Sequence, residues 1–241
     1  MLLSSAYFPP LSWLALAARD FTLSPDRVLP SVVQLEACEN YQKQSYRNRC
    51  YILAGDGVQM LQVPVKHGKG EVLLSSTSLR DPVRANVQER GTSPLNIQNV
   101  LVDYSTPWVV RTQRALDTAY ETAAYYEYYR DDVFAVLDAR PETLWELNLS
   151  TIRLLLEKTG IACMLSPTSA FAAPGSEPDD YRFSIHPKQP DPILESLGLE
   201  RPYYQVFQER LGGFTPRLSA LDLLFNEGPD SILWLKKLST I

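Results

Sequence analysis

Hydrophobic and polar positions in the first part of the chain follow the spacing of strands and one helix. Residues 2–8 form an apolar run that stops at two prolines. Because proline cannot donate to a sheet, this pattern predicts a buried strand, followed by a helix from Leu11. β-Branched residues in 31–41 predict a second strand. Two apolar runs in 49–66 surround Gly-Asp-Gly, which predicts a β-hairpin because these residues tolerate positive φ.

Helical spacing dominates the middle of the chain. Residues 111–129 contain no Gly or Pro and repeat apolar residues at helical intervals, which predicts one long amphipathic helix. Further helices are predicted around 133–140 and over 141–158. Before them, 67–99 shows no persistent period and predicts an exposed excursion, whereas 99–104 predicts a strand.

The C-terminal part alternates between loop composition and helical spacing. Residues 161–166 predict a strand, and two further helices are predicted over 217–228 and 229–238. The density of Pro, Ser, Gly and Asp in 167–192 predicts a loop or insertion. Together these elements predict an α/β fold with a mixed sheet, a β-hairpin, flanking helices and a helical C-terminal half. We expect a single domain over 1–241.

Composition narrows the class of protein. The chain has 241 residues and a net charge of -5, so nothing in its charge indicates nucleic acid as a partner. Its N-terminus lacks the pattern of a signal peptide, and no apolar run approaches the roughly 20 residues of a transmembrane segment. The three cysteines show no disulfide or zinc spacing. We therefore expect a cytoplasmic protein with reduced thiols.

One polar stretch, "ENYQKQSYRNRC" at 39–50, stands directly before the predicted hairpin. In an extended conformation Arg47 and Arg49 face the same side, where two guanidinium groups would hold a phosphate or carboxylate. The acidic residues Glu36, Glu39 and Asp103 are either partners of these arginines or catalytic carboxylates. The alternative is a structural network of ion pairs and amides that ties the hairpin to the domain.

Other candidate groups are few. The chain lacks the glycine-rich, phosphate-loop and nucleophile-elbow motifs, so no cofactor is indicated. The two histidines, His67 and His186, are 119 positions apart, which disfavours a histidine metal site, and we expect no metal. His186 is either a general base or an exposed loop histidine. Asp222 stands among apolar residues and needs a buried partner.

The ordered motifs "YFPP", "ENYQKQSYRNRC", "LQVPVK", "VDYSTPW", "AYYEYY" and "LSALDLLFNEGP" resemble the WbqC-like protein family. The resemblance implies a bacterial protein, often encoded among genes for surface polysaccharide or O-antigen assembly. The family positions carried over are Tyr7, Pro9, Asn40, Arg47, Asn48, Arg49, Lys66, Trp108, Tyr120, Asp222 and Asn226.

The chain departs from its relatives at two places. Ser5 and Ala6 stand where many relatives carry Gln-Pro, and 167–192 replaces a loop that contains Gly-Pro-Gly. If that loop holds a substrate in other members, the ligand or the site differs here.

Two hypotheses about function follow. The first is an acyl- or aminoacyltransferase acting on a nucleotide-linked amino-sugar, in which Glu39 or Asp103 accepts a proton and Asn48 orients the substrate. Residues assigned to binding this small anionic or nucleotide-sugar ligand are Tyr7, Asn40, Arg47, Arg49, Lys66, Trp108 and Tyr120. The second hypothesis is a non-catalytic binding or scaffolding module with a protein partner in the same pathway.

Overall fold

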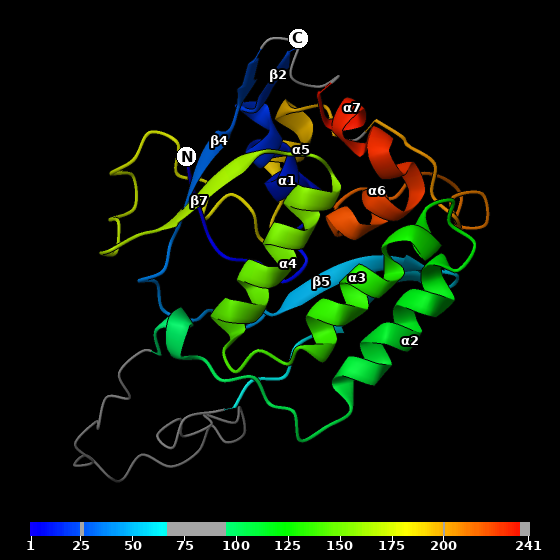
Figure 1. Ribbon diagram of the computed structural model, residues 1–241, viewed down its shortest axis with the longest axis horizontal. Coiled ribbons are helices and arrows are strands. Elements are labelled where there is room, and N and C mark those ends of the chain that lie inside the picture. The colour runs from blue at the N-terminus through cyan, green and yellow to red at the C-terminus, as the bar shows by residue number, and fades with distance from the viewer. Residues whose placement is uncertain (25–26, 67–94, 200, 237–241) are drawn as a thin grey trace, which may run out of the picture.

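The structure is a computed structural model (Figure 1). It describes residues 1–24, 27–66, 95–199 and 201–236. Predictions that fall on 67–94, including His67, lie outside the described residues.

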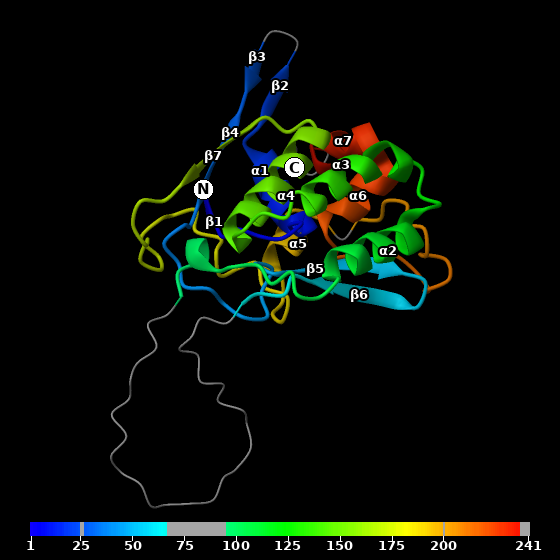
Figure 2. The same ribbon diagram turned by 60° about the horizontal axis from the view of Figure 1, so that its bottom comes forward.

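Three short strands form a small parallel sheet. Its strands are β1 (Leu2–Leu3), β4 (Ser31–Leu35) and β7 (Cys163–Pro167), in the order β1-β4-β7. Helix α1 (Leu11–Arg19) connects β1 toward β4. Between α1 and β4 in the sequence, β2 (Thr22–Ser24) and β3 (Arg27–Leu29) form a two-stranded antiparallel ribbon. This ribbon projects from the body of the molecule (Figure 2).

The predicted hairpin is confirmed. Strands β5 (Arg49–Ala54) and β6 (Gly57–Gln62) pair in antiparallel register, with Arg49 opposite Gln62. The connecting turn brings Ala54 opposite Gly57, whose φ of 126° is accessible to glycine. In Figure 2 this hairpin forms one margin of the molecule, with α2 (Trp108–Tyr120) beside it.

The predicted helix over 111–129 is wrong in its extent, because the structure contains two helices there. Helix α2 ends at Tyr120, and α3 covers Tyr126–Asp138. Between them the Tyr125 N–H donates to the Phe225 carbonyl at 3.0 Å, so a contact from a distant helix takes a donor that a continuous helix would use. Helix α4 (Leu144–Lys158) follows and begins with a capping box at Thr143.

Three of the predicted strands are much shorter than expected. The predicted strand over 31–41 is regular only at Ser31–Leu35. The predicted strand over 2–8 is regular only at Leu2–Leu3, and Phe8 has a left-handed φ of 40° ahead of the two prolines. Residues 99–104 contain only isolated bridges, after a 3-10 helix η1 over Ile97–Asn99. Val102 bridges to Val65, and Leu101 bridges to Thr143.

The C-terminal part is helical. Its elements are α5 (Pro192–Ser196), α6 (Ala220–Glu227), the 3-10 helix η2 (Gly228–Asp230) and α7 (Ser231–Lys236). Residues 168–191, between β7 and α5, form turns and loops without a helix or strand.

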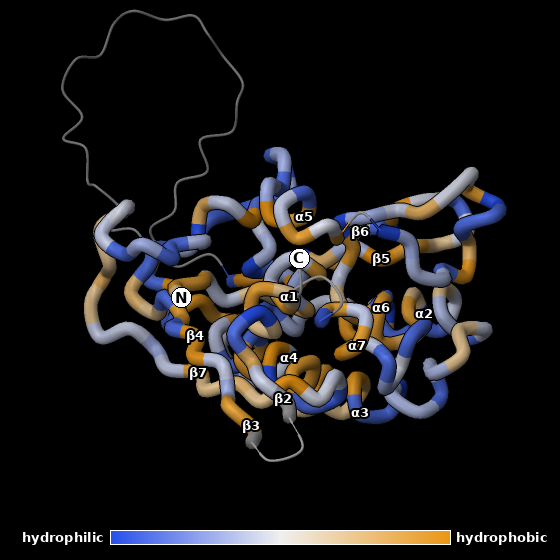
Figure 3. Tube along the Cα trace, turned by 90° about the horizontal axis from the view of Figure 1, so that it is seen from above, coloured by the Kyte–Doolittle hydropathy of each residue, from blue (hydrophilic) through white to orange (hydrophobic). Residues whose placement is uncertain are grey.

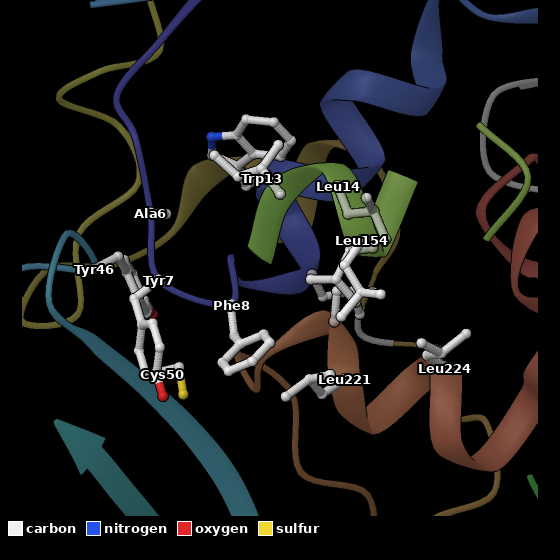
Figure 4. Packing of buried hydrophobic residues seen from close by; sticks show 14 of the residues in the cluster. Ala6, Tyr7, Phe8, Trp13, Leu14, Tyr46, Cys50, Leu154, Leu221 and Leu224 are labelled. Atoms are coloured by element: carbon white, nitrogen blue, oxygen red, sulfur yellow. The ribbon is translucent and has the colours of Figure 1, made fainter. Parts of the chain in front are cut away.

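One hydrophobic core joins these elements. Figure 4 shows Tyr7 beside Cys50 of β5, and Phe8 between Cys50 and Leu221 of α6; both aromatic residues are fully buried. The hydrophobic segments of α1, α4 and α6 meet in the interior, whereas hydrophilic positions lie on the outer turns (Figure 3). Within the described ranges, none of the helices has the length and apolar character needed to cross a bilayer.

Candidate functional site

The polar stretch 39–50 lies partly in the protein interior and partly along a surface hollow. Residues 46 and 47 lie in a turn, and the chain becomes extended only at Arg49, where β5 begins. The expectation that Arg47 and Arg49 together hold one ligand is therefore wrong in its premise, because the backbone between them is not extended. Arg47 lies in the interior, whereas Arg49 lines a surface hollow.

Arg47 is the interior member. Its Nε donates to Glu39 Oε1 at 2.8 Å, and its Nη2 donates to Glu39 Oε2 and to Ser4 Oγ. Ser4 Oγ also donates to Glu39 Oε2 at 3.2 Å. The Arg47 and Glu39 residues are only 3% and 5% exposed, so each charge depends on the other. Both Glu39 oxygens already accept hydrogen bonds, which matches the structural network considered above better than a proton acceptor.

A second buried ion pair stands next to the first. Arg182 Nη1 donates to Glu36 Oε2 at 2.5 Å, and Arg182 Nε donates to Asp180 Oδ1 at 2.9 Å. Thr168 Oγ1 donates to Glu36 Oε1 at 2.6 Å. Arg182 and Thr168 therefore fasten the 168–191 segment to Glu36 at the carboxyl end of β4, and Asp180 holds the Arg182 guanidinium in place. Arg182 is not among the residues predicted from the sequence. The only signal for it there is its position next to the aromatic residue Phe183, which is exposed in the structure.

Arg49, by contrast, lines a surface hollow of about 300 Å³, here called the basic hollow. It is open to solvent and carries the cationic residues Lys43 and Arg49. Its lining residues are Tyr41, Lys43, Gln44, Asn48, Arg49, Gln62, Pro64 and Val65. No acidic side chain of the described residues lines it. Gln44 has a left-handed φ of 60°, a strained conformation that is frequent at functional sites.

Two residues that line the basic hollow, Asn48 and Arg49, each carry a buried polar atom with no hydrogen-bond partner in the described part of the chain. The two atoms are Asn48 Oδ1 and Arg49 Nε, an acceptor and a donor on successive residues. Asn48 itself is held in place, because its Nδ2 donates to the Val63 carbonyl at 3.1 Å. Buried polar atoms are almost always paired in folded proteins, so these two are candidates for contact with a ligand or water.

A second hollow of about 300 Å³, here called the edge hollow, adjoins the first. The two share Gln62 and Pro64. The edge hollow lies between β6 and α2 and is lined by Gln59, Met60, Leu61, Gln62, Pro64, Trp108, Arg111, Thr112 and Ala115. Trp108 stacks on Tyr104 with ring centroids 5.7 Å apart, and its buried Nε1 has no acceptor among the described residues.

Asp103 and Lys66 lie near the shared wall of these hollows. The Asp103 N–H donates to the Pro64 carbonyl at 2.9 Å, and Asp103 Oδ1 accepts from the Ser105 N–H at 2.9 Å. Hydrogen bonds from Ser105, backbone and side chain, and the nearby Lys66 charge lower the pKa of the Asp103 carboxyl. A lowered pKa makes Asp103 a weaker base than an ordinary aspartate.

Several residues carried over from the resemblance lie away from both hollows. The Tyr120 hydroxyl donates to Asp222 Oδ1 at 2.8 Å, and the Tyr203 hydroxyl donates to Asp222 Oδ2 at 2.6 Å. Burial raises the pKa of Asp222, although the hydrogen bonds from Tyr203, Gln205 and Tyr120 oppose this shift. These groups join β5, α2 and α6 inside the core.

The remaining predicted residues are also placed. Tyr7 is fully buried, and burial raises the pKa of its hydroxyl. Asn226 Nδ2 donates to the Asp222 carbonyl at 2.7 Å within α6. Asn40 is exposed and bridges to Asn96 through the backbone. Neither Tyr7, Asn40 nor Asn226 lines either hollow.

His186 is half-buried beside the first ion pair. Burial, followed by the charges of Arg47 and Lys188, lowers the pKa of its imidazole. Its Nδ1 accepts from the Lys188 N–H at 3.2 Å, so one ring nitrogen is engaged locally. In the part of the chain that the structure describes, no group of three potential ligands is arranged for a metal ion.

The fold and these hollows define a class of protein: an α/β domain with a cationic, amide-lined groove beside a β-hairpin. The chain belongs to the WbqC-like protein family, whose model matches residues 31–90 and 74–186. It is similar to an uncharacterized protein of Mycobacterium tuberculosis (strain ATCC 25618 / H37Rv), with 23% identity over 216 residues that cover 81% of this chain and 84% of that protein. No solved structure matches the chain significantly.

Proposed function

We propose that this protein acts in bacterial surface-polysaccharide (O-antigen) assembly and binds a nucleotide-linked amino-sugar in the groove formed by the basic and edge hollows. The observation that carries this proposal is that Asn48 and Arg49, which line a hollow together with Lys43, each have a buried polar atom, Oδ1 and Nε, without a partner among the described residues. Membership of the WbqC-like protein family supports the choice of pathway.

The chemistry of the basic hollow fits the anionic part of such a ligand. The Arg49 guanidinium and the Lys43 ammonium favour a diphosphate, and no carboxylate of the described residues competes in the lining. The amide of Asn48, with Gln44 and Gln62, provides donors and acceptors for sugar hydroxyl groups. The adjoining hollows provide the size of a small-molecule site.

The reaction that we assign to this groove is acyl or aminoacyl transfer from an activated thioester donor. The sugar amine attacks the thioester carbonyl, a carbon–nitrogen bond forms, the carbon–sulfur bond breaks, and the thiolate leaves with the bonding electrons. The ammonium proton passes to water or to Asp103, the predicted carboxylate nearest the groove. Glu39 takes no part in this step, because Arg47 and Ser4 occupy both of its oxygens.

A second candidate is a non-catalytic binding module of the same pathway. The lowered pKa of Asp103 and the enclosed position of Glu39 favour it, since both predicted proton acceptors are poorly suited to general-base catalysis. This candidate uses the same groove and the same ligand, but it turns over no donor.

Calorimetric titration with UDP-N-acetylglucosamine tests the binding site. Arg49→Gln removes the cation and is expected to weaken binding about 10- to 100-fold, the value of a hydrogen bond to a charged group. Arg114→Gln is the matched control, because Arg114 is an exposed arginine of α2 that lines neither hollow. Equal affinities of the two variants, both with native circular dichroism, would contradict the proposal.

Mass spectrometry separates the two candidates. Wild-type protein is incubated with UDP-glucosamine and a panel of acyl and aminoacyl thioesters. A nucleotide sugar that gains the mass of the acyl group identifies the transferase. Unchanged substrates, together with measurable binding, identify the binding module.

A further inference from the structure

Strand β6 pairs along one edge with β5, and its other edge pairs with no strand of the described residues, so it is here called the free edge. The Val63 N–H donates to the Asn48 carbonyl at 2.9 Å, and Arg49 stands opposite Gln62. In an antiparallel pair, hydrogen-bonded and non-hydrogen-bonded positions alternate. The backbone N–H and C=O groups of Met60 and Gln62 therefore point away from β5.

The free edge is open over a short length. From Pro64 onward the neighbouring segment 101–103 occupies it, because the Pro64 carbonyl accepts from the Asp103 N–H and the Lys66 N–H donates to the Leu101 carbonyl, both at 2.9 Å. The backbone groups of Met60 and Gln62 receive no hydrogen bond from the described part of the chain. The free edge therefore presents the backbone N–H and C=O groups of Met60 and Gln62, which could pair with an extended ligand as they would with another strand.

The edge hollow runs along these open groups. Four consecutive residues, Gln59 to Gln62, line it. Because successive side chains of a strand point to opposite faces, a hollow that touches all four lies against the strand's edge. The opposite wall is α2, where Trp108 is 4% exposed and its Nε1 lacks an acceptor among the described residues. A ligand carbonyl would satisfy such a donor.

The shape and chemistry of this edge select its occupant. In an extended amino-acid residue the N–H and C=O point to the same side, which matches the outward pair on Met60. A volume of about 300 Å³ admits a small group rather than a folded partner, and the residues Gln62 and Pro64 line both this hollow and the basic hollow.

We infer that the edge hollow binds an aminoacyl group in extended conformation, through backbone hydrogen bonds to the free edge of β6. This is the strand-addition mode of peptide recognition, reduced to a single residue. The inference rests on the proposed function in its choice of ligand, because the nucleotide-sugar acceptor is assigned to the basic hollow and the aminoacyl group of the donor must lie beside it. It names the donor group as aminoacyl rather than simple acyl.

Proline substitution tests the backbone contact. Met60→Pro removes the outward N–H and leaves the hydrogen bonds to β5 in place, since edge strands tolerate proline on the free side. Val58→Pro is the matched control, because the same alternation turns its N–H outward and it does not line the hollow. Met60→Ala keeps the N–H and removes the side chain.

The probe is N-acetylglycine N-methylamide, titrated into the full ¹⁵N-labelled chain and followed by NMR. In wild type we expect shifts of the Met60 and Gln62 amide signals. The dissociation constant of Met60→Pro is expected to be about 3- to 10-fold higher than that of Val58→Pro, the range for one lost hydrogen bond, and to exceed that of Met60→Ala, which loses only side-chain contacts. Equal constants, or no shift at Met60 and Gln62 in wild type, would overturn the inference.

A second titration, with UDP-N-acetylglucosamine, separates this inference from the proposed function. Shifts at Asn48 and Arg49 with the nucleotide sugar, and none at Met60 with the blocked glycine, overturn the aminoacyl site alone. Shifts with the blocked glycine and none with the nucleotide sugar overturn the proposed ligand and leave the aminoacyl site. If neither compound changes the spectrum, both are overturned.

Discussion

Arg47 and Arg49 differ by two positions and have different roles in the structure. Arg47 is enclosed with Glu39, whereas Arg49 lines the basic hollow, and its Nε has no partner among the residues that the structure describes. Sequence predicted that this stretch is rich in polar contacts, and it left open whether they serve a ligand or the fold. The sequence could not assign different roles to the two arginines, because the difference depends on a turn that brings Ser4 and Glu39 around Arg47.

Arg47→Met tests the structural role of the first arginine. It leaves the Glu39 carboxylate buried without its partner, so we expect the free energy of unfolding in urea to fall by about 3–5 kcal/mol. The double variant Arg47→Met with Glu39→Leu is expected to recover most of this loss, since it removes both charges. If the single variant unfolds at the wild-type urea concentration but no longer binds ligand, Arg47 belongs to the ligand site instead.

Asp222 makes the free energy of unfolding depend on pH in the direction opposite to that of most aspartates, whose pKa is lowered by folding. An unfolded aspartate loses its proton near pH 3.9, whereas burial raises the pKa of Asp222 in the folded chain. Between these two pKa values the folded state binds more protons than the unfolded state, so the contribution of Asp222 to stability falls as pH rises above about 4.

The variant Asp222→Asn isolates this contribution. We expect the free energy of unfolding of wild type, measured in urea at several pH values, to decline relative to the variant from pH 4 upward. The exposed Asp230 provides the control, because Asp230→Asn is expected to keep the wild-type profile. Parallel profiles of wild type and Asp222→Asn would contradict the raised pKa.

At the scale of elements, local signals were sufficient for the hairpin and insufficient for the helices. Gly-Asp-Gly and two apolar runs place β5 and β6 correctly, because turn chemistry and strand pairing are both local there. The break between α2 and α3 has no Gly or Pro to mark it. It depends on Phe225, whose ring packs 5.0 Å from Tyr120 and 4.9 Å from Tyr126, and whose carbonyl binds the Tyr125 N–H.

Gly228 tests how this junction is packed. Its φ is 54°, and a Cβ atom there would stand 2.4 Å from the Tyr125 ring. Gly228→Ala is therefore expected to lower the free energy of unfolding by about 2–4 kcal/mol, through backbone strain and overpacking.

Gly160→Ala separates the two causes. Gly160 also has a positive φ of 72°, but nothing lies within 4 Å of the added Cβ. It is expected to cost about 1 kcal/mol, the strain alone. Thermal unfolding of both variants measures the difference, and equal losses would show that the contact with Tyr125 is unimportant.

At the scale of the whole molecule, the mixed α/β architecture and the helical C-terminal half agree with the sequence prediction. The loop composition of 167–192 gave no indication that Arg182 would anchor this segment to Glu36, because that contact spans 146 positions. Contacts of such separation leave no periodic pattern in a single sequence.

The single domain over 1–241 stays a prediction, and calorimetry checks it. Because one core joins the sheet, the hairpin and α6, we expect one thermal transition with equal calorimetric and van't Hoff enthalpies. Two resolved transitions, or a van't Hoff enthalpy well below the calorimetric one, would indicate independently folding parts.

The enclosed pair of Glu39 and Arg47 also has an evolutionary consequence. Because each charge requires the other, we expect positions 39 and 47 to co-vary among descendants of this chain, with paired replacements accepted and single ones removed by selection. Position 49 lines the basic hollow. If the proposed ligand binds there, this position can diverge whenever the ligand does. A lineage that changes its substrate should therefore record the change at 49 and leave 39 and 47 alone.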